Sequence, residues 1–196
     1  MPRRLPYFDG PSEDFFVEPA KCSRCGKKCD CFYSRSTRQY GCLSCLRECK
    51  FALAHDTEIG WLDGGVLTAW DHHLEESVVV EPPPGFRAEA LRDLQFAPWF
   101  KSHQESTYLV HCNDFMHYIG RWEPEDFERE ASYEPKALFL EIAEGDGELW
   151  EATERQKAEF GDQWPYYLSS HWAYGSWVYV FECRKCGIRR CYWDCS

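Results

Sequence analysis

The hydrophobic pattern is strongest near the end of the chain, where it predicts a two-stranded hairpin. Residues 176–183 read SWVYVFEC, and both faces of a strand through them are apolar apart from Glu182. A strand that is apolar on both faces is typical of the interior of a sheet. The following CRKCG is a tight turn, and residues 188–194 (IRRCYWD) give an antiparallel return strand. The pattern therefore predicts a central strand with an antiparallel neighbour.

Helical patterns occupy shorter stretches elsewhere. Leu43, Leu46, Cys49 and Leu53 fall on one face of a helix through residues 43–55. Residues 87–94 and 148–160 have helical composition, as does the stretch 66–76 that follows a glycine pair. Short strands are expected over residues 77–81 (SVVVE) and 108–112. The expected fold class is α+β, a mixed antiparallel sheet with helices.

Two Cys-x-x-Cys pairs organise the N-terminal part of the chain: Cys22 with Cys25, and Cys42 with Cys45. Four thiols at this spacing are typical of a tetrahedral zinc site, with disulfides or unligated thiols as the alternatives. Gly26 lets the backbone fold back so that amide N–H groups can reach the thiolates. A knuckle, a hairpin and a helix carrying the last ligands would form a treble-clef or zinc-ribbon-like lobe. Because protein fills all four positions, we expect a structural Zn2+.

A second knuckle, formed by Cys183 and Cys186, lies in the C-terminal turn. It supplies two ligands, so a complete second zinc site needs two more. The candidates to complete it are His111, Cys112, Cys191 and Cys195. A zinc ribbon in which the two knuckles pair with each other is one alternative. Another is a tight turn whose thiols pack as small apolar groups.

Charge is distributed unevenly along the chain of 196 residues, whose net charge is −11. Residues 21–50 hold eight Lys or Arg against two acids, a net +6, which leaves −17 for the remainder. Residues 121–165 hold fourteen acids against five Lys or Arg, a net −9. Phosphates would be repelled by such a chain as a whole, so nucleic acid is not the expected partner. The balance suits a basic partner.

Length and composition predict one domain, residues 1–196, containing a zinc lobe at 21–55 and a knuckle hairpin at 171–196. No apolar run approaches a membrane span, and the first ten residues lack the apolar core of a signal peptide. We therefore expect a cytoplasmic protein without membrane contact. In a reducing compartment, twelve cysteines favour metal ligands and buried thiols over disulfides.

One cluster of residue types invites a catalytic interpretation. The run His111-Cys112-Asn113-Asp114 contains a nucleophile and a base, but neighbours on a strand point to opposite faces. A working Cys–His pair normally comes from separate elements. No phosphate-binding glycine loop, paired metalloprotease histidines or nucleophile elbow occurs in the sequence. We therefore expect no enzymatic activity.

Several separated motifs resemble the CbrC-like family, small bacterial proteins linked with tolerance to nuclease colicins. The matching pieces are LPYF at 5–8, CSRCG at 22–26, CLSCL at 42–46, Pro98, HQESTYLVHCNDFMHYIG at 103–120 and FECRKCGIRRCYWD at 181–194. Leu43 and Ser44 replace the Pro and Trp usual in that family, and His103 replaces a Trp. The resemblance implies a soluble bacterial protein with cysteine-rich metal sites and an association with toxin tolerance.

Resemblance and charge together predict a zinc-containing protein that confers immunity to a toxin with a basic nuclease domain. An acidic, aromatic-rich face would attract and hold such a domain. The predicted contact residues are Trp122, Glu123, Glu125, Asp126, Glu148, Trp150 and Glu151, with Trp164, Tyr166 and Tyr167 nearby. The alternative is that the aromatic residues belong to the core and that the acidic residues are ordinary solvated surface residues with no partner-binding role.

A nucleic-acid- or ribosome-associated zinc protein is the competing hypothesis. It would use the cations of the N-terminal lobe and the aromatic residues beside them. These are Lys21, Arg24, Lys27, Lys28, Arg35 and Arg38, with Phe32, Tyr33 and Tyr40. A metal-dependent enzyme at His111 and Cys112 is the less favoured third hypothesis.

Overall fold

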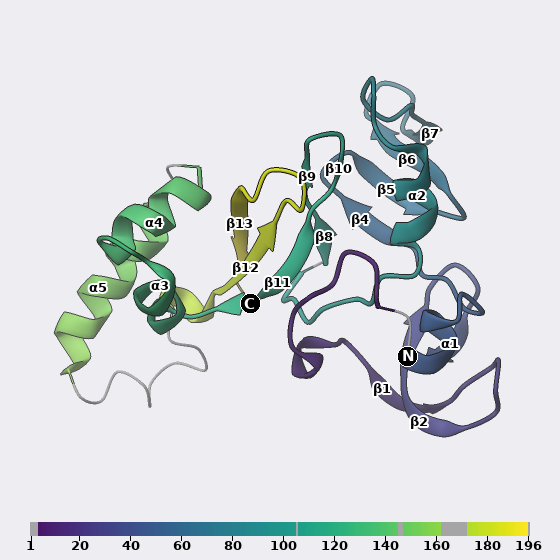
Figure 1. Ribbon diagram of the computed structural model, residues 1–196, viewed down its shortest axis with the longest axis horizontal. Coiled ribbons are helices and arrows are strands. Elements are labelled where there is room, and N and C mark those ends of the chain that lie inside the picture. Colours follow the sequence, from purple (N-terminus) through teal and green to yellow (C-terminus); the bar gives the residue numbers. More distant parts are fainter. Residues whose placement is uncertain (1–3, 105, 145–146, 162–171, 196) are drawn as a thin grey trace.

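The computed structural model describes residues 4–104, 106–144, 147–161 and 172–195 (Figure 1). These residues form several small sheets with helices at their edges, which confirms the expected α+β class. Figure 1 shows three regions around a central sheet: an N-terminal lobe, a five-stranded sheet and a group of helices on the opposite side. Among the described residues, none of the helices combines the length and hydropathy needed to cross a bilayer.

The N-terminal lobe follows an extended arm that contains the short helix η1 (Ser12–Asp14). Its antiparallel sheet has the order β1-β2-β3, built from β1 (Glu18–Lys21), β2 (Lys28–Ser34) and β3 (Gln39–Cys42). Helix α1 (Leu43–Arg47) begins directly after β3. The helix predicted over 43–55 is thus too long, because Cys49 adopts a left-handed conformation with φ of 55°.

The five-stranded sheet has the order β7-β6-β5-β4-β8. Its strands are β4 (His55–Thr57), β5 (Gly60–Asp63), β6 (Val66–Asp71), β7 (Glu76–Val79) and β8 (Thr107–Tyr108). Neighbours are antiparallel except β4 and β8. The helix predicted over 66–76 is wrong: Gly64 and Gly65 take positive φ and turn β5 back into β6. Helix α2 (Ala88–Leu94) matches its prediction.

The central sheet, β11-β12-β13, is antiparallel and contains the predicted terminal hairpin. Its strands are β11 (His117–Trp122), β12 (Trp177–Glu182) and β13 (Arg189–Asp194). A separate small hairpin, β9 (Val110–His111) and β10 (Asp114–Phe115), precedes β11. Strand β12 lies in the middle, as its two apolar faces predict.

The helical lobe follows β11 and contains α3 (Pro124–Glu130), α4 (Pro135–Ile142) and α5 (Glu148–Phe160). Helix α5 has the predicted bounds. The short helix η3 (Ala173–Gly175) then leads into β12. A reciprocal capping box between Glu123 and Asp126 begins α3, so both side chains satisfy backbone N–H groups.

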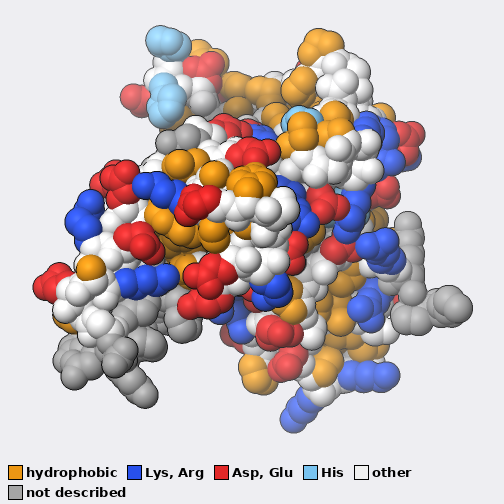
Figure 2. All heavy atoms as spheres, turned by 60° about the vertical axis from the view of Figure 1, so that its left-hand side comes forward, with side chains coloured by type: hydrophobic (Ala, Val, Ile, Leu, Met, Phe, Trp, Pro, Cys, Tyr) orange, Lys and Arg blue, Asp and Glu red, His pale blue; other side chains and the backbone are white. Residues whose placement is uncertain are grey.

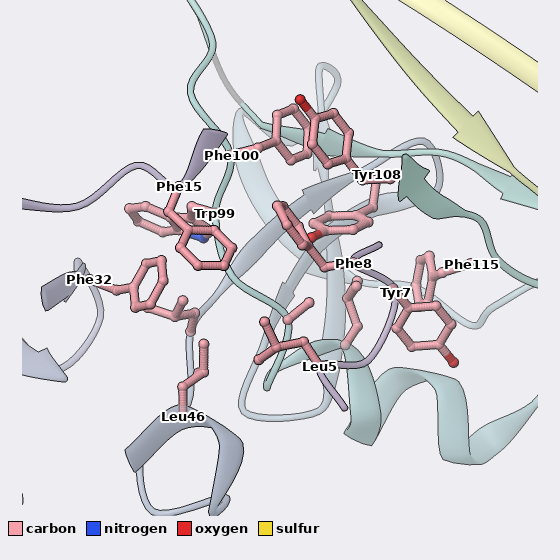
Figure 3. Packing of buried hydrophobic residues seen from close by; sticks show 14 of the residues in the cluster. Leu5, Tyr7, Phe8, Phe15, Phe32, Leu46, Trp99, Phe100, Tyr108 and Phe115 are labelled. Carbon is pink, nitrogen blue, oxygen red and sulfur yellow. The ribbon is translucent and has the colours of Figure 1, made fainter. Parts of the chain in front are cut away.

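Strand β12 separates two aromatic cores. Tyr179 and Phe181 belong to the large core, where Phe100 stacks on Tyr118 with ring centroids 4.3 Å apart. That core also receives the N-terminal arm, shown by Tyr7, Phe8 and Phe15 in Figure 3. Val178 and Val180 face the second core, where Phe127, Phe139, Trp150 and Trp172 pack beneath the helices. One strand therefore supports both halves of the protein.

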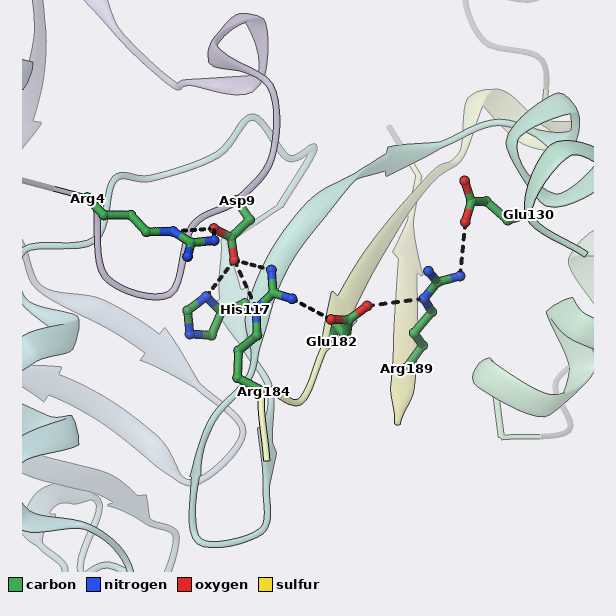
Figure 4. A network of polar contacts seen from close by, with 7 residues as sticks. All are labelled: Arg4, Asp9, His117, Glu130, Glu182, Arg184 and Arg189. Atoms are coloured by element: carbon green, nitrogen blue, oxygen red, sulfur yellow. Dashed lines mark hydrogen bonds and ion pairs between the residues drawn. The ribbon is translucent and has the colours of Figure 1, made fainter. Parts of the chain in front are cut away.

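A chain of polar contacts crosses the central sheet from the arm to the helical lobe (Figure 4). Asp9 accepts from Arg4, from His117 and from Arg184, the last at 2.6 Å. Burial raises the pKa of the Asp9 carboxyl, but these hydrogen bonds outweigh it and hold that pKa below its ordinary value. Arg184 also pairs with Glu182, which contacts Arg189 on the neighbouring strand. The contacts fix the arm and the C-terminal knuckle against the same sheet.

His55 of β4 gives a prediction for stability against pH. Its ring is fully buried and edge-on to Tyr108 at 5.3 Å, and burial lowers its pKa from 6.5 to about 3. Between these values the unfolded chain binds a proton that the folded chain does not, so stability falls as pH falls below 6.5. The expected loss from His55 is about 2 kcal/mol at pH 5.

Urea unfolding of the wild type and of His55→Leu at pH 7 and pH 5 measures this loss. The variant should lose about 2 kcal/mol less than the wild type between the two pH values. His73→Leu, which changes an exposed histidine, should follow the wild type. Parallel pH dependence of the wild type and His55→Leu would contradict the prediction.

Candidate metal centres

The first candidate centre joins the two N-terminal cysteine pairs. The Sγ atoms of Cys22, Cys25, Cys42 and Cys45 all lie within 4.8 Å of one another. Cys22 and Cys45 are separated by 3.8 Å, and Cys25 and Cys42 by 3.7 Å. Four sulfurs at about 2.3 Å from a tetrahedral zinc would be about 3.8 Å apart. The donor set therefore could form a zinc site, and the alternative in which the two knuckles pair with each other is wrong.

Local structure brings these four thiols together. Cys22 follows β1, Cys42 ends β3, and Cys45 lies in α1. Gly26 has a φ of 74°, and its N–H donates to the Cys22 carbonyl at 2.9 Å, which closes the knuckle. The treble-clef prediction of a knuckle, a hairpin and a helix carrying the last ligands thus matches the arrangement.

A close approach fixes strand β3 against the segment after α1. A Cβ on Gly41 would lie 2.1 Å from the ring of Phe51, so only glycine fits there. Because Gly41 precedes Cys42, this packing also places the third thiol. The ligand positions therefore depend on apolar contacts as well as on the cysteine spacing.

The environment of the first centre favours thiolate at one position. Burial raises the pKa of Cys22, but backbone N–H groups of Cys25, Cys42 and Arg24 outweigh it and lower that pKa to about 6. Burial and the neighbouring thiols raise the pKa of Cys45. A cation among these sulfurs would stabilise the thiolate form of all four, which is the form that binds metal.

The second candidate centre lies where the C-terminal knuckle meets the β9–β10 hairpin. His111, Cys112, Cys183 and Cys186 place one donor atom each within 4.8 Å of the others. Cys112 and Cys186 have Sγ atoms 3.7 Å apart, and His111 Nδ1 lies 3.2 Å from Cys186 Sγ. Three thiols and an imidazole fit a tetrahedral metal site. Of the four candidates named from the sequence, His111 and Cys112 therefore complete the set.

A two-residue turn brings His111 and Cys112 to the same site. Cys112 and Asn113 have φ values of 50° and 57°, as in a type I′ hairpin turn. Cys112 is therefore not a strand residue, and the expectation that its side chain points away from that of His111 is wrong. His111 and Cys112, which were considered as a base and a nucleophile, therefore both contribute donor atoms to one ligand set.

The two knuckles share one hydrogen-bond pattern. In the second, Gly187 N–H donates to the Cys183 carbonyl and Cys183 N–H donates to the Ile188 carbonyl, each at 2.8 Å. In the first, the corresponding bonds from Gly26 and from Cys22 measure 2.9 and 2.8 Å. Similar five-residue turns thus supply half of each ligand set.

Polar contacts fix the β9–β10 hairpin in place. Lys185 of the knuckle donates to the Cys112 carbonyl at 2.8 Å. Arg87 forms an ion pair with Asp114 at 3.1 Å. On the other side, Glu58 accepts from the amide N–H of Val110 and pairs with Arg190, both at 2.9 Å. The hairpin is therefore held to the knuckle, to α2 and to the five-stranded sheet.

The two centres differ in their exposure. In the first, only Cys25 is exposed, whereas Cys112 and Cys186 of the second are both exposed. A hollow of about 660 Å³ lies beside the second centre, with His111 and Cys186 in one wall and α4 in another. The first ligand set is thus enclosed, while the second borders open solvent.

The other cysteines lie outside both ligand sets, and all twelve in the chain are free thiols. Cys191 pairs with Val180 across the central hairpin and is not grouped with Cys183. Cys29 and Cys31 lie on one strand with Sγ atoms 3.9 Å apart. The disulfide alternative has no support in these positions.

The predicted partner-binding residues separate into two classes. Trp122 and Trp150 are buried, so their place in a contact face is wrong and they form part of the second core. Glu125, Glu148 and Glu151 are exposed on α3 and α5. Glu123 and Asp126 are partly buried in the helix cap. Trp164, Tyr166 and Tyr167 lie outside the described residues.

Residues 5–195 match a family described as an uncharacterised protein family, UPF0167. The chain belongs to this family. The UPF0167 match begins in the N-terminal arm and ends after β13, so it includes both ligand sets. Comparison with curated proteins and with solved structures finds no match to the chain.

The geometry predicts two metal equivalents per chain. Protein purified in reducing buffer should contain two zinc ions by elemental analysis, and Cys25→Ser or Cys186→Ser should each remove one. Chelation of both ions should abolish the near-ultraviolet circular dichroism of the aromatic cores, because structural zinc contributes folding free energy.

Cys29→Ser is the matched control, because Cys29 is exposed in the same lobe but belongs to neither set. It should keep both metal ions. A metal-free wild type with intact dichroism would contradict the prediction, and so would the loss of both ions from Cys186→Ser.

Proposed function

We propose that this protein is a non-enzymatic zinc protein that binds a basic protein partner through its helical lobe. Zinc in each centre would hold the fold together, with all four positions filled by protein in both cases. His111 and Cys112 then serve as ligands, which accounts for these residue types without a catalytic step. The observation that carries the proposal is the separation of charge between the lobes.

Charge and shape support a partner surface on the helical lobe. Residues 121–165 carry a net charge of −9, whereas residues 21–50 carry +6. Figure 1 shows α3, α4 and α5 on the side of the central sheet opposite the N-terminal lobe. An acidic lobe directed away from the basic N-terminal lobe would attract a basic partner over a distance of about 10 Å at ordinary salt.

Several acids of the helical lobe already have cationic neighbours. In Figure 2 the molecule is turned so that the helical lobe comes forward, and acidic (red) and basic (blue) side chains are interspersed on this face. Asp126 pairs with Arg129, and Glu151 lies 3.7 Å from Lys136. The Glu151–Lys136 pair is exposed and contributes little to stability, so a partner could replace it at small cost. The excess of acids over these internal pairs is what would be available for binding.

The resemblance to CbrC-like proteins suggests which basic partner this is. Nuclease toxins carry basic surfaces that bind phosphate, and an acidic protein that covers such a surface would block the nuclease. We therefore propose tolerance to a bacterial nuclease toxin in the cytoplasm, with Glu125, Glu148 and Glu151 as contact residues. Trp122 and Trp150 would support this face from beneath.

Charge reversal tests the proposal. Glu125→Lys/Glu151→Lys should slow association with a colicin nuclease domain by about tenfold at low salt, with less effect at high salt, because electrostatic steering is screened. Surface-based binding kinetics measure the rate, and survival of bacteria exposed to the toxin measures protection.

Glu76→Lys/Glu81→Lys is the matched control, since both residues are exposed acids at the two ends of the β7 segment, and the change in net charge is equal. Figure 1 shows β7 across the molecule from the helical lobe. It should leave the association rate nearly unchanged. The proposal fails if the wild type does not bind nuclease domains and gives no protection, or if both double variants slow binding equally.

A second candidate function, nucleic-acid binding by the N-terminal lobe, has one specific observation in its favour. Lys21, Arg24, Lys27, Lys28, Arg35 and Arg38 are all exposed. Tyr33 and Tyr40 lie beside them, with ring centroids 5.0 Å apart, whereas Phe32 is buried and unavailable. A basic lobe with accessible aromatic rings is a common arrangement for contacting a single strand.

A gel-shift series with short DNA and RNA tests this second candidate. Binding should weaken steeply with rising salt and should be lost in Lys27→Glu/Lys28→Glu, because phosphate contacts release counterions. Retarded bands that are insensitive to salt and to this variant would exclude the N-terminal lobe as the binding surface.

A further inference from the structure

The second candidate metal centre presents two thiols to solvent. Cys112 lies in the turn of the β9–β10 hairpin and Cys186 in the knuckle between β12 and β13, and both are exposed. Figure 1 shows this knuckle reaching the β9–β10 hairpin. The two Sγ atoms are 3.7 Å apart. Because the sulfurs of a disulfide are about 2 Å apart, the two thiols need to approach by less than about 2 Å to be joined.

The other two donors of this centre are less accessible. Cys183 is 2% exposed and belongs to the large core, and the knuckle engages both its N–H and its carbonyl in hydrogen bonds. His111 is partly buried and has no thiol to oxidise. The side chain of Cys112, in contrast, lies in an exposed turn, where it can shift without disturbing a core. Cys112 and Cys186 are therefore the pair that a small reagent in solvent can both reach and join.

The hollow beside this centre gives such a reagent a route. Cys186, Gly187 and Ile188 of the knuckle line it, and Leu138 and Ile142 of α4 lie across from them. Ile188 is 49% exposed, so this part of the knuckle is open to solvent. A small uncharged oxidant can therefore approach the Cys186 sulfur from the hollow.

The first centre offers no equivalent pair. Only Cys25 of its four thiols is exposed, and the other three are buried. The Sγ of Cys42 lies 3.7 Å from that of Cys25, but Cys42 ends β3 directly after Gly41, which packs against the ring of Phe51. A thiol held by a strand and a core cannot move toward its neighbour without disturbing that packing. An oxidant should therefore act on the second centre before the first.

We propose that Cys112 and Cys186 form a reversible disulfide when the protein meets hydrogen peroxide, and that this oxidation removes the metal ion from the second centre. The disulfide leaves His111 and Cys183 as donors, fewer than the four that a structural zinc site uses. The inference rests on the zinc that the proposed function assigns to this centre. It does not depend on a toxin partner.

Two steps form the disulfide, with hydrogen peroxide as the oxidant. The Cys186 thiolate attacks one peroxide oxygen, so an S–O bond forms, the O–O bond breaks and hydroxide leaves. The Cys112 thiolate then attacks the sulfenic sulfur, so the S–S bond forms, the S–O bond breaks and a second hydroxide leaves. The two thiolates lose the two electrons that the peroxide gains, and both hydroxides take protons from solvent to become water.

The disulfide would keep the β9–β10 hairpin joined to the knuckle after the metal is lost. Contacts that need no metal also hold this hairpin, among them the bond from Lys185 to the Cys112 carbonyl and the ion pair between Arg87 and Asp114. The oxidised protein should therefore stay folded while the first centre remains loaded. A thiol reductant should then restore the complete ligand set.

Zinc release, followed with a chromogenic zinc indicator, tests the assignment. The zinc-loaded wild type, freed of reductant and exposed to excess hydrogen peroxide, should release one zinc ion per chain and lose two thiols. Mass spectrometry of a digest made without reductant should show Cys112 linked to Cys186, and dithiothreitol should restore both thiols. Cys186→Ser, which holds only the ion of the first centre, should keep that ion under the same exposure.

Cys112→His separates metal binding from disulfide formation. An imidazole replaces the thiolate as the fourth donor, so the variant should hold two zinc ions but release the second at least about tenfold more slowly than the wild type. Cys29→Ser is the matched control, because it removes an exposed thiol that belongs to neither ligand set. It should release zinc at the wild-type rate. If Cys112→His does not load a second ion, the disulfide found in the wild type decides the question.

Three results would overturn the assignment alone: retention of the second ion in excess peroxide, a disulfide between Cys183 and Cys186 instead, or release from Cys112→His as fast as from the wild type. Loss of zinc from Cys186→Ser at the wild-type rate would also overturn it, because the first centre would then be equally sensitive. A reduced wild type that never holds a second zinc ion would overturn both this inference and the second centre of the proposed function.

Discussion

Burial of both faces of β12 is the constraint on which the rest of the fold depends. Tyr179 and Phe181 enter the large core, while Val178 and Val180 enter the core beneath the helices. A strand with no solvent face needs cover on each side, so the arm and the five-stranded sheet must pack on one side and α3–α5 on the other. The helical lobe is therefore not an appendage, because without it half of β12 would be exposed to water.

The candidate metal centres lie where this packing leaves short, irregular segments. The knuckle of the second centre directly follows β12, and its partner hairpin directly precedes β11, so both ligand pairs extend from adjacent strands of one sheet. The ion-pair chain from Asp9 through Arg184 to Glu130 runs beside them. The first candidate centre similarly lies where α1 meets the small N-terminal sheet. Ligand sets, salt bridges and cores thus occur at the same junctions.

The sequence predicted those features that depend on local pattern. Cysteine spacing identified the first ligand set, the apolar run at 176–183 and its tight turn identified β12 and β13, and helical composition identified α2 and α5. Predictions failed where a single backbone conformation or a tertiary contact decided the result. Left-handed Cys49 ended α1 early, and left-handed Cys112 turned its thiol toward His111. The glycine pair before β6 was a hairpin signal that the helical composition of the next residues obscured. Burial of Trp122 and Trp150 depends on the packing of three helices, which periodicity alone does not give.

The order of the ligands along the chain affects how the protein is made. Cys22 and Cys45 are 23 positions apart, so the first centre can close while most of the chain is still being synthesised. His111 and Cys186 are 75 positions apart, so the second ligand set is complete only once the chain has been synthesised through Cys186. Until then, the exposed Cys112 thiol has no metal partner from the knuckle and is open to oxidation. The second ligand set therefore closes later in synthesis than the first, and its capacity to hold a metal ion would depend on the thiol redox state that Cys112 meets in that interval.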